Sequence, residues 1–311
     1  MTDPAVPVLA LDHATRRMAG RVVVDGMDLA VARGEVLGLL GVNGAGKSTT
    51  LRMMAGVLAP DAGSVRLEGA DLYEDPRRAR QAIGYLPEVP PLHGELTTQE
   101  FLAFCARLHG VSRAGVAAAV ARAIERCGLG DARRRLLGTL SKGLRQRVGL
   151  AQAIVHEPAL IVLDEPASGL DPVQAANLRG LVRSLGRSHA IVLSTHVLAD
   201  VPACCDRVAI VHQGQLRHAG PAVAEADGRT LRVQTAQPAT PADWAMLATV
   251  ASATALAEGD WRVRLRDDAT VTALAAEVVA RFGLVALAAE RAPLEQVFLA
   301  IAAGEPLAPA A

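Results

Sequence analysis

The stretch "GVNGAGKST", Gly41 to Thr49, limits the possible folds of this 311-residue chain more than any other. It matches the pattern G-x-x-x-x-G-K-[ST], which holds phosphate groups when it joins a strand to a helix. The apolar run "EVLGLLG" comes before it, and "KSTTLRMMAGV" follows with helical character. Glycines at this spacing let backbone N–H groups face phosphate oxygens, and the helix N-terminus adds a positive dipole. The sequence therefore predicts a phosphate-binding loop in an α/β fold.

Carboxylates follow a second apolar strand in the same part of the chain. The runs "ALIVLDE" and "AIVLSTH" are apolar almost throughout, as strands buried on both faces of a parallel sheet are. Ligands bind at the carboxyl ends of such strands, where Asp164, Glu165 and His196 stand. An acidic strand end in a solvated loop is the plainer alternative, but it fits poorly beside a phosphate loop. We expect a mostly parallel sheet covered by helices.

This arrangement assigns a role to each polar side chain. Lys47 is expected to reach the β- and γ-phosphates, and the Ser48 hydroxyl to ligate Mg²⁺. Asp164 is placed to hold the same ion through a water, while Glu165 is placed to orient or deprotonate an attacking water.

The pattern of expected strands and helices changes after about residue 222, which predicts two domains, residues 1–222 and 223–311. A mostly helical insertion spans about residues 96–156, and Thr97 with Glu100 fits a capping box at its first helix. Residues 229–311 read as strand, helix, strand, strand, helix, strand and a last helix, a small α+β domain of split-βαβ type. A dimer-stabilising or regulatory role and a contact with a specific partner are both open for this domain.

Composition narrows the classes of partner. Thirty-two basic and thirty-two acidic residues give a net charge of zero, so the overall charge does not indicate nucleic-acid binding. No apolar run reaches the roughly 20 residues of a membrane span, and the first residues lack a signal-peptide pattern. A cytoplasmic chain is therefore expected. Cys204 and Cys205 could bind a soft metal, although two small residues before a strand are the simpler reading.

The stretch "LSKGLRQR", Leu140 to Arg147, is by itself either a nucleotide-contacting signature or a basic helix start. Its neighbours decide between these alternatives. With "GVNGAGKST", "LIVLDEP", "SGLDP" and "LSTH" in this order, residues 7 to 220 resemble the ATP-binding cassette (ABC) ATPases. The form "SKG-RQR" with "IGYLPE" and the ending "LEQVFLAI" is similar to single-cassette subunits of bacterial ABC type 2 exporters, including those of gliding motility and nitrous-oxide-reductase maturation.

The resemblance implies ATP and Mg²⁺ as ligands and a set of site residues. Ser141 and Gly143 are implied to contact the γ-phosphate of ATP held by a second copy, and Ser141 also caps its helix. The remaining implied sites are catalytic Glu165, His196 and Lys47; nucleotide-binding Gly41, Asn43, Gly44, Ala45, Gly46, Lys47, Ser48, Thr49 and Met18; the dimer-facing Asp171; the coupling residue Glu88; and the metal ligands Ser48, Asp164 and Glu88.

Four positions depart from the family pattern. Lys142 and Leu144 change "LSGGQ" to "LSKGL", and the added cation beside a polyphosphate should not harm binding. Glu88 stands where a glutamine is usual, so weaker metal binding or slower turnover is expected. Met18 stands where a tyrosine stacks on adenine, and its thioether contact predicts modest discrimination between ATP and GTP.

The resemblance thus implies an ATPase that dimerises head to tail on Mg·ATP and drives a separate membrane permease, in export, from the cytoplasmic face of the inner membrane. The alternative is a soluble ABC-type ATPase with a regulatory or assembly role and no transport. Loss of Glu165 or His196 would have favoured a degenerate subunit, yet both are present.

Overall fold

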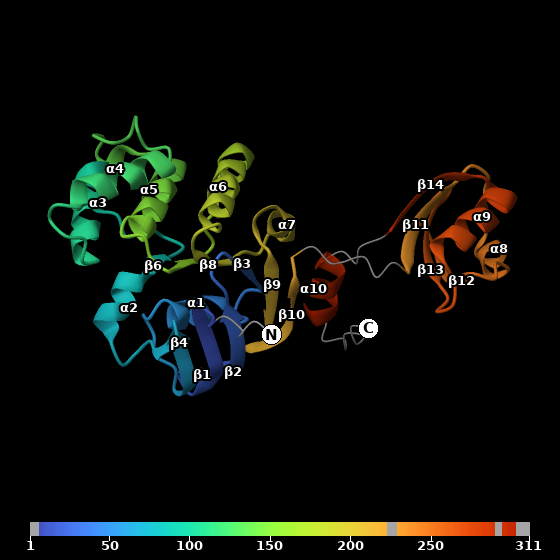
Figure 1. The fold of residues 1–311 in the computed structure, drawn as a ribbon, viewed down its shortest axis with the longest axis horizontal. Helices are drawn as coiled ribbons and strands as arrows, with labels where there is room; N and C mark the ends of the chain where they lie inside the picture. Colours follow the sequence, from blue (N-terminus) through green and yellow to red (C-terminus); the bar gives the residue numbers. More distant parts are fainter. Residues whose placement is uncertain (1–5, 223–228, 290–293, 303–311) are drawn as a thin grey trace. The chain divides into compact units, whose positions relative to one another are not determined.

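The computed structural model describes residues 6–222, 229–289 and 294–302. The chain divides into two compact units, one of residues 1–222 with 298–311 and one of residues 223–297 (Figure 1). This division differs from the predicted domains at residues 298–311, which group with the first unit. Ile301 in α10 (Leu294–Ala302) is buried, and burial of this apolar side chain accounts for the grouping of the segment with the first unit.

A six-stranded sheet forms the centre of the first unit, in the order β10-β9-β3-β8-β7-β6. All neighbours are parallel except β9 and β10. The expected mostly parallel sheet is therefore confirmed. The strands are β3 (Val36–Leu40), β6 (Ile83–Leu86), β7 (Leu160–Leu163), β8 (Ala190–Ser194), β9 (Arg207–His212) and β10 (Gln215–Pro221).

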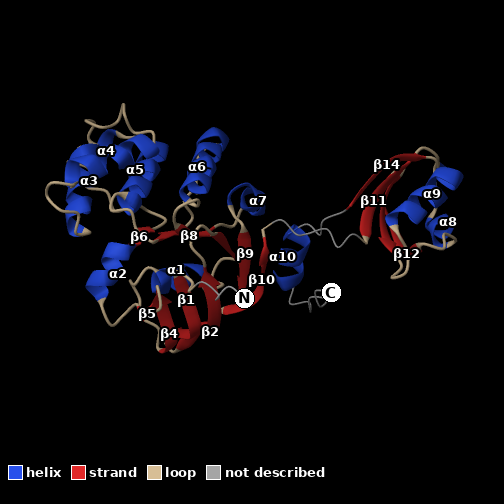
Figure 2. Cartoon of the chain, in the orientation of Figure 1, coloured by secondary structure: helices blue, strands red, loops and turns tan. Residues whose placement is uncertain are grey.

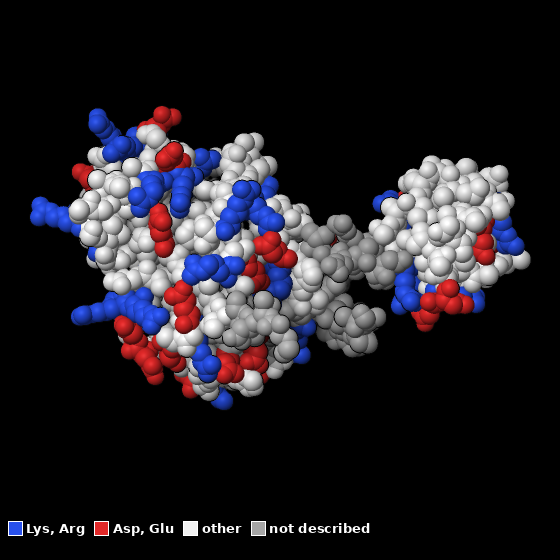
Figure 3. Space-filling view, in the orientation of Figure 1, with Lys and Arg blue, Asp and Glu red and all other residues white. Residues whose placement is uncertain are grey.

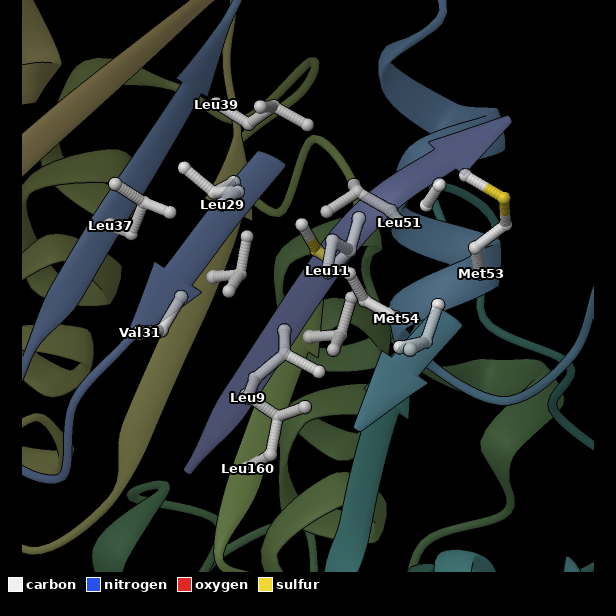
Figure 4. Close-up of a cluster of buried hydrophobic side chains, with 14 of the residues drawn as sticks. Leu9, Leu11, Leu29, Val31, Leu37, Leu39, Leu51, Met53, Met54 and Leu160 are labelled. Carbon is white, nitrogen blue, oxygen red and sulfur yellow. The ribbon is translucent and has the colours of Figure 1, made fainter. Parts of the chain in front are cut away.

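A second, antiparallel sheet holds β1 (Leu9–Met18), β2 (Arg21–Val31), β4 (Ala62–Leu67) and β5 (Ala70–Asp71), in the order β2-β1-β4-β5. Helix α1 (Lys47–Met54) contacts β1 and β2 on one side and β7 and β8 on the other. Its Leu51, Met53 and Met54 are fully buried among leucines and valines of both sheets (Figure 4). Burying each such side chain stabilises the fold by about 1.5–3 kcal/mol, so the core fixes the helix that carries Lys47.

The remaining helices of the first unit include a helical region between β6 and β7 (Figure 2). The capping box of Thr97 and Glu100 is present at the start of its first helix. The helices are α2 (Pro76–Ala82), α3 (Thr98–Leu108), α4 (Val116–Arg126), α5 (Lys142–Ile154), α6 (Pro172–Leu185) and α7 (Val201–Cys204), with 3-10 turns at Leu137–Thr139 and Leu198–Asp200.

The second unit has the predicted strand and helix order, and its antiparallel sheet runs β12-β13-β11-β14. Trp244, Trp261 and Phe282 pack in its core. Helix α8 is short, and Val250, five residues after its end, already pairs with Leu265 in the sheet. Its elements are β11 (Thr230–Thr235), α8 (Pro241–Ala245), β12 (Val250–Ala257), β13 (Asp260–Leu265), α9 (Val271–Phe282) and β14 (Leu284–Ala289).

Among the helices within the described ranges, none has both the length and the apolar content to cross a bilayer.

Candidate active site

The phosphate loop joins β3 to α1 and is shaped by glycines that no other residue could replace. Gly46 has φ 106° and caps α1 without a side-chain bond. A Cβ on Gly46 would lie 2.6 Å from the Val23 carbonyl oxygen, and one on Gly41 would lie 2.5 Å from that of Val211. Both contacts are too short for a real Cβ. The first turn of α1 therefore presents its N–H groups to the loop, where an anion would bind.

Lys47 points back across this loop. Its Nζ donates to the Gly41 carbonyl at 2.7 Å and to the Val42 carbonyl at 3.3 Å, and the side chain is buried. The Lys47 ammonium group is thus held against two backbone carbonyl groups of the loop.

Three oxygen groups meet beside the start of α1. Asp164 Oδ1 accepts from Ser194 Oγ at 2.7 Å and from Ser48 Oγ at 3.4 Å, and Asp164 is 4% exposed. Burial raises the pKa of the neighbouring Tyr85, and the charge of Asp164 raises it further. Carboxylate and hydroxyl oxygens are hard ligands of the type that Mg²⁺ prefers, so the donor set fits that ion.

Glu165 is held by two polar neighbours in an unusual backbone conformation. Its φ is 47°, in the left-handed region, its N–H donates to Ser194 Oγ at 2.8 Å, and Oε2 lies 2.8 Å from His196 Nδ1. The Glu165 side chain is 15% exposed and that of His196 is 59% exposed. A strained residue kept by its surroundings is a feature of functional sites, and here it aims the carboxylate at the loop.

A cavity of about 460 Å³ lies over these groups. Val23, which the sequence did not single out, also lines it, as does Ser168, the first residue of the motif "SGLDP". Of the residues expected from sequence, Gly41, Ala45, Asp164, Met18, Ser141, Gly143 and Asp171 do not. The lining residues are Val23, Asn43, Gly44, Gly46, Lys47, Ser48, Thr49, Glu88, Glu165, Ser168 and His196.

Met18, the predicted adenine contact, lies outside this lining. Met18 ends β1, pairs with Arg21 and is 44% exposed. Val23, on β2, lines the cavity instead. The signal for Val23 was weak, because β2 belongs to the antiparallel sheet and reaches the loop only through the folded structure.

The start of α5 packs against the start of α6. Ser141 caps α5 by accepting from Leu144 N at 3.4 Å, as predicted. A Cβ on Gly143 would lie 2.0 Å from Gln174 Oε1, and one on Gly169 would lie 2.0 Å from Lys142 Nζ. Lys142 therefore lies over the loop that carries Ser168, and the signature segment and this loop contact each other within one chain.

Asp171 ends that loop and caps α6. Its Oδ1 accepts from the Gln174 N–H at 2.8 Å. Asp171 thus fixes both the backbone of the loop and the position of Gln174 in the first turn of α6.

Comparisons with known proteins agree with this geometry. The family model of ABC transporters matches residues 24–168. The bacitracin transport ATP-binding protein BcrA of Bacillus licheniformis is 35% identical over 211 residues, which are 67% of this chain and 68% of that protein. The Nod factor export ATP-binding protein I of Burkholderia orbicola is 37% identical over 204 residues, 65% of this chain and 67% of that protein.

A solved ATP-binding subunit of an ABC transporter superposes with a TM-score of 0.63 at 32% identity, covering 69% of this chain and 90% of that one. The family-model match spans the phosphate loop, the segment Leu140 to Arg147 and the Asp164–Glu165 strand end. The chain belongs to the ABC transporter family as an ATP-binding protein with ATPase activity.

Proposed function

We propose that the chain is the Mg·ATP-driven subunit of an exporter, that it works as a head-to-tail pair of copies, and that it drives a separate membrane permease. The observation that carries the proposal is the make-up of the 460 Å³ cavity. Lys47, Ser48 and Glu165 line it, whereas Ser141 and Gly143 do not. A second copy would supply that missing wall.

The first half-site prepares the nucleotide. The loop N–H groups and Lys47 bind the β- and γ-phosphates. Ser48, Asp164 through a water, and Glu88 are the candidate ligands of Mg²⁺, which would neutralise charge on the phosphates when bound. The hydrogen bond from Ser48 to Asp164 supports a shared ion at this place.

Glu165 and His196 serve the reaction itself. Glu165 accepts a proton from, or orients, the water that attacks the γ-phosphorus. His196 lies 2.8 Å from Glu165 Oε2 and is exposed enough to turn toward the γ-phosphate. The bond between them keeps the carboxylate aimed at the cavity before the water enters.

The second copy completes the site with its own α5. Gly143 and Ser141 stand at the start of a 13-residue helix, whose dipole favours an anion. Asp171 then lies on the surface that faces the partner. Closure is favoured by ligand contacts that exist only in the closed pair, so hydrolysis reopens it.

Transport is supported by the relatives. One is named for bacitracin transport and one for Nod factor export, and each is an ATP-binding protein. The membrane path would belong to another polypeptide, with this chain on the cytoplasmic face of the inner membrane. Basic and acidic side chains are interspersed over the face drawn in Figure 3, which supports a protein partner rather than nucleic acid.

The test is Mg·ATP hydrolysis by the full chain and by Glu165→Gln, with oligomeric state followed by light scattering. We expect Glu165→Gln to lose at least about 10²-fold in rate, the usual contribution of a general base, and to accumulate an ATP-dependent dimer. Glu258→Gln, an exposed glutamate in the second unit, is the matched control and should behave like the wild type. A monomeric Glu165→Gln protein at saturating Mg·ATP would contradict the head-to-tail pair.

A further inference from the structure

Cys204 and Cys205, at the end of α7, bring two thiols together. Their Sγ atoms lie 3.7 Å apart, and the residues are only 3% and 4% exposed. The other cysteines of the chain, Cys105 and Cys127, are free thiols as well.

The pair lies between the carboxyl ends of β7 and β8 on one side and β3 on the other. Cys204 lines a small cavity together with Glu165 and Ser194, at the carboxyl ends of β7 and β8. On the other side, a Cβ on Gly38 would lie 3.0 Å from Cys205 Sγ, so this sulfur packs on β3, the strand that leads into the phosphate loop. A structural change at Cys204 or Cys205 would therefore affect both the strand ends that carry Ser194 and Glu165 and the strand that leads into the phosphate loop.

A disulfide between Cys204 and Cys205 is geometrically unfavourable. Neighbouring Cα atoms are about 3.8 Å apart, which is shorter than the roughly 4.4–6.8 Å that disulfides usually span. A single bridging atom suits the geometry better. Two bonds of about 2.3 Å, as in metal thiolates, meeting at a near-tetrahedral angle, leave the sulfurs about 3.8 Å apart.

The chemistry of the two sulfurs also favours a soft, thiophilic centre. The hydrogen bond from Cys205 lowers the pKa of the Cys204 thiol, and the same contact raises the pKa of Cys205. Cys204 thus becomes the first nucleophile of the pair. Within the described residues, no other side chain is shown to complete a four-ligand zinc site here.

The geometry points to Cys204 and Cys205 as a binding site for one trivalent arsenical, whose occupation slows ATP hydrolysis. The hydrated reagent R–As(OH)₂ exchanges its two As–O bonds for two As–S bonds. Each thiol proton leaves with a hydroxide as water, so two waters are released and arsenic stays trivalent. No oxidant or reductant is needed.

Hydrolysis slows because the site shares a wall with the catalytic carboxylate. The cavity holds about 20 Å³, room for one water, so an arsenical group must push its walls apart. One wall is Ser194, whose hydroxyl accepts from the Glu165 N–H and donates to Asp164 Oδ1. Moving this hydroxyl displaces both carboxylates from the phosphate loop.

The test uses phenylarsine oxide on the full chain, with intact mass giving the number of arsenicals bound and Mg·ATP hydrolysis measured on the same samples. Because both sulfurs are buried, incubation continues until the mass is constant. We expect one arsenical per chain, loss of most of the hydrolysis, and recovery of both with a dithiol but not with a monothiol.

Cys204→Ser and Cys205→Ser should each abolish this bidentate binding and make ATP hydrolysis resistant to phenylarsine oxide. Cys105→Ser and Cys127→Ser should behave like the wild type. Cys204→Ala and Cys205→Ala repeat the test if a serine variant does not fold by circular dichroism. Stable binding that persists in the Cys204 and Cys205 variants overturns the site. Full occupancy with unchanged hydrolysis overturns its coupling to Glu165. The binding result stands or falls independently of the proposed transport function.

Discussion

The contact of Gly143 with Gln174 in its own chain can be tested separately from its proposed contact with the ATP of a second copy. A methyl group on it would collide with Gln174 Oε1 at 2.0 Å. It would also cover the main chain that the partner's phosphate is proposed to contact. Alanine favours a helix over glycine by about 1 kcal/mol, so Gly143→Ala should not lower helix stability. We therefore expect it to lower ATP hydrolysis without lowering the melting temperature.

Gln174→Ala removes the collision and serves as the matched background. In this background Gly143→Ala should remain inactive, because the proposed phosphate contact is still covered. Hydrolysis rates of the four proteins in the cycle measure this directly. Recovery of hydrolysis in the double variant would show instead that crowding within one chain causes the loss.

Which site residues the sequence could predict depends on how local their signals are. Lys47, Ser48, Asp164 and Glu165 follow directly from a strand and a motif in continuous sequence, and the structure brings them together. Val23 and Gln174 reach their places only through packing between distant elements, so no short pattern marks them. Met18 is marked only by its position in a motif, and its role remains a prediction.

Asp171 joins the loop that carries Ser168 to α6 by capping that helix. Asp171→Ala removes the cap and should lower the free energy of unfolding by about 1 kcal/mol. Asp171→Asn keeps a good cap without the charge, so its stability should match the wild type. Urea unfolding measures both values.

The same two variants separate stability from pairing. If the Asp171 carboxylate contacts the second copy, both variants lose ATP-dependent dimerisation in light scattering, although only one loses stability. Thr270→Ala, which removes the cap of α9 in the second unit, controls for a general effect of cap loss. A normally dimerising Asp171→Asn protein would restrict Asp171 to its capping role.

The junction of α5 with β6 is predicted to make stability depend on pH. His156 is bonded to the Ile83 carbonyl at 3.1 Å and stacked on His109 at 3.9 Å. Burial, with a smaller contribution from His109, lowers the pKa of His156 to about 3. The unfolded chain takes up this proton near pH 6.5, but the folded chain resists it until about pH 3.

Stability should therefore fall as the pH drops below 6.5, by up to about 1.4 kcal/mol per pH unit from this one residue. His156→Gln keeps an N–H donor for Ile83 without the titration, so its loss of stability between pH 7.5 and 5 should be smaller than that of the wild type. Urea unfolding at the two pH values provides the comparison. Equal losses in both proteins would remove His156 as the cause.

The sequence predicted the order of elements in both units, but not that α10 from Phe298 onward groups with the first unit. Alternating strands and helices carry periodic signals, so the phosphate-loop unit and the βαββαβ unit were recognisable. The short apolar segment Leu294–Ala302 carries no signal for which core it joins. Its Ile301 is buried, and that outcome depends on the folded surfaces available to it.

The two units can be followed separately in the intact chain because both tryptophans, Trp244 and Trp261, lie in the core of the second unit. Mg·ATP is proposed to bind the first unit, and a ligand at 100 times its Kd stabilises the folded state by about 2.7 kcal/mol. We therefore expect Mg·ATP to raise the main thermal transition in circular dichroism by several degrees. The tryptophan-fluorescence transition should stay where it is.

Lys47→Ala provides the control, since it should abolish the shift in circular dichroism and leave the fluorescence transition unaltered. If Mg·ATP moved both transitions by the same amount in the wild type, the second unit would be sharing the free energy of nucleotide binding. Deleting residues 223–297 while keeping 298–311 would then be expected to change ATP affinity, because the part of α10 that groups with the first unit, from Phe298 onward, would remain and the coupled second unit would be lost.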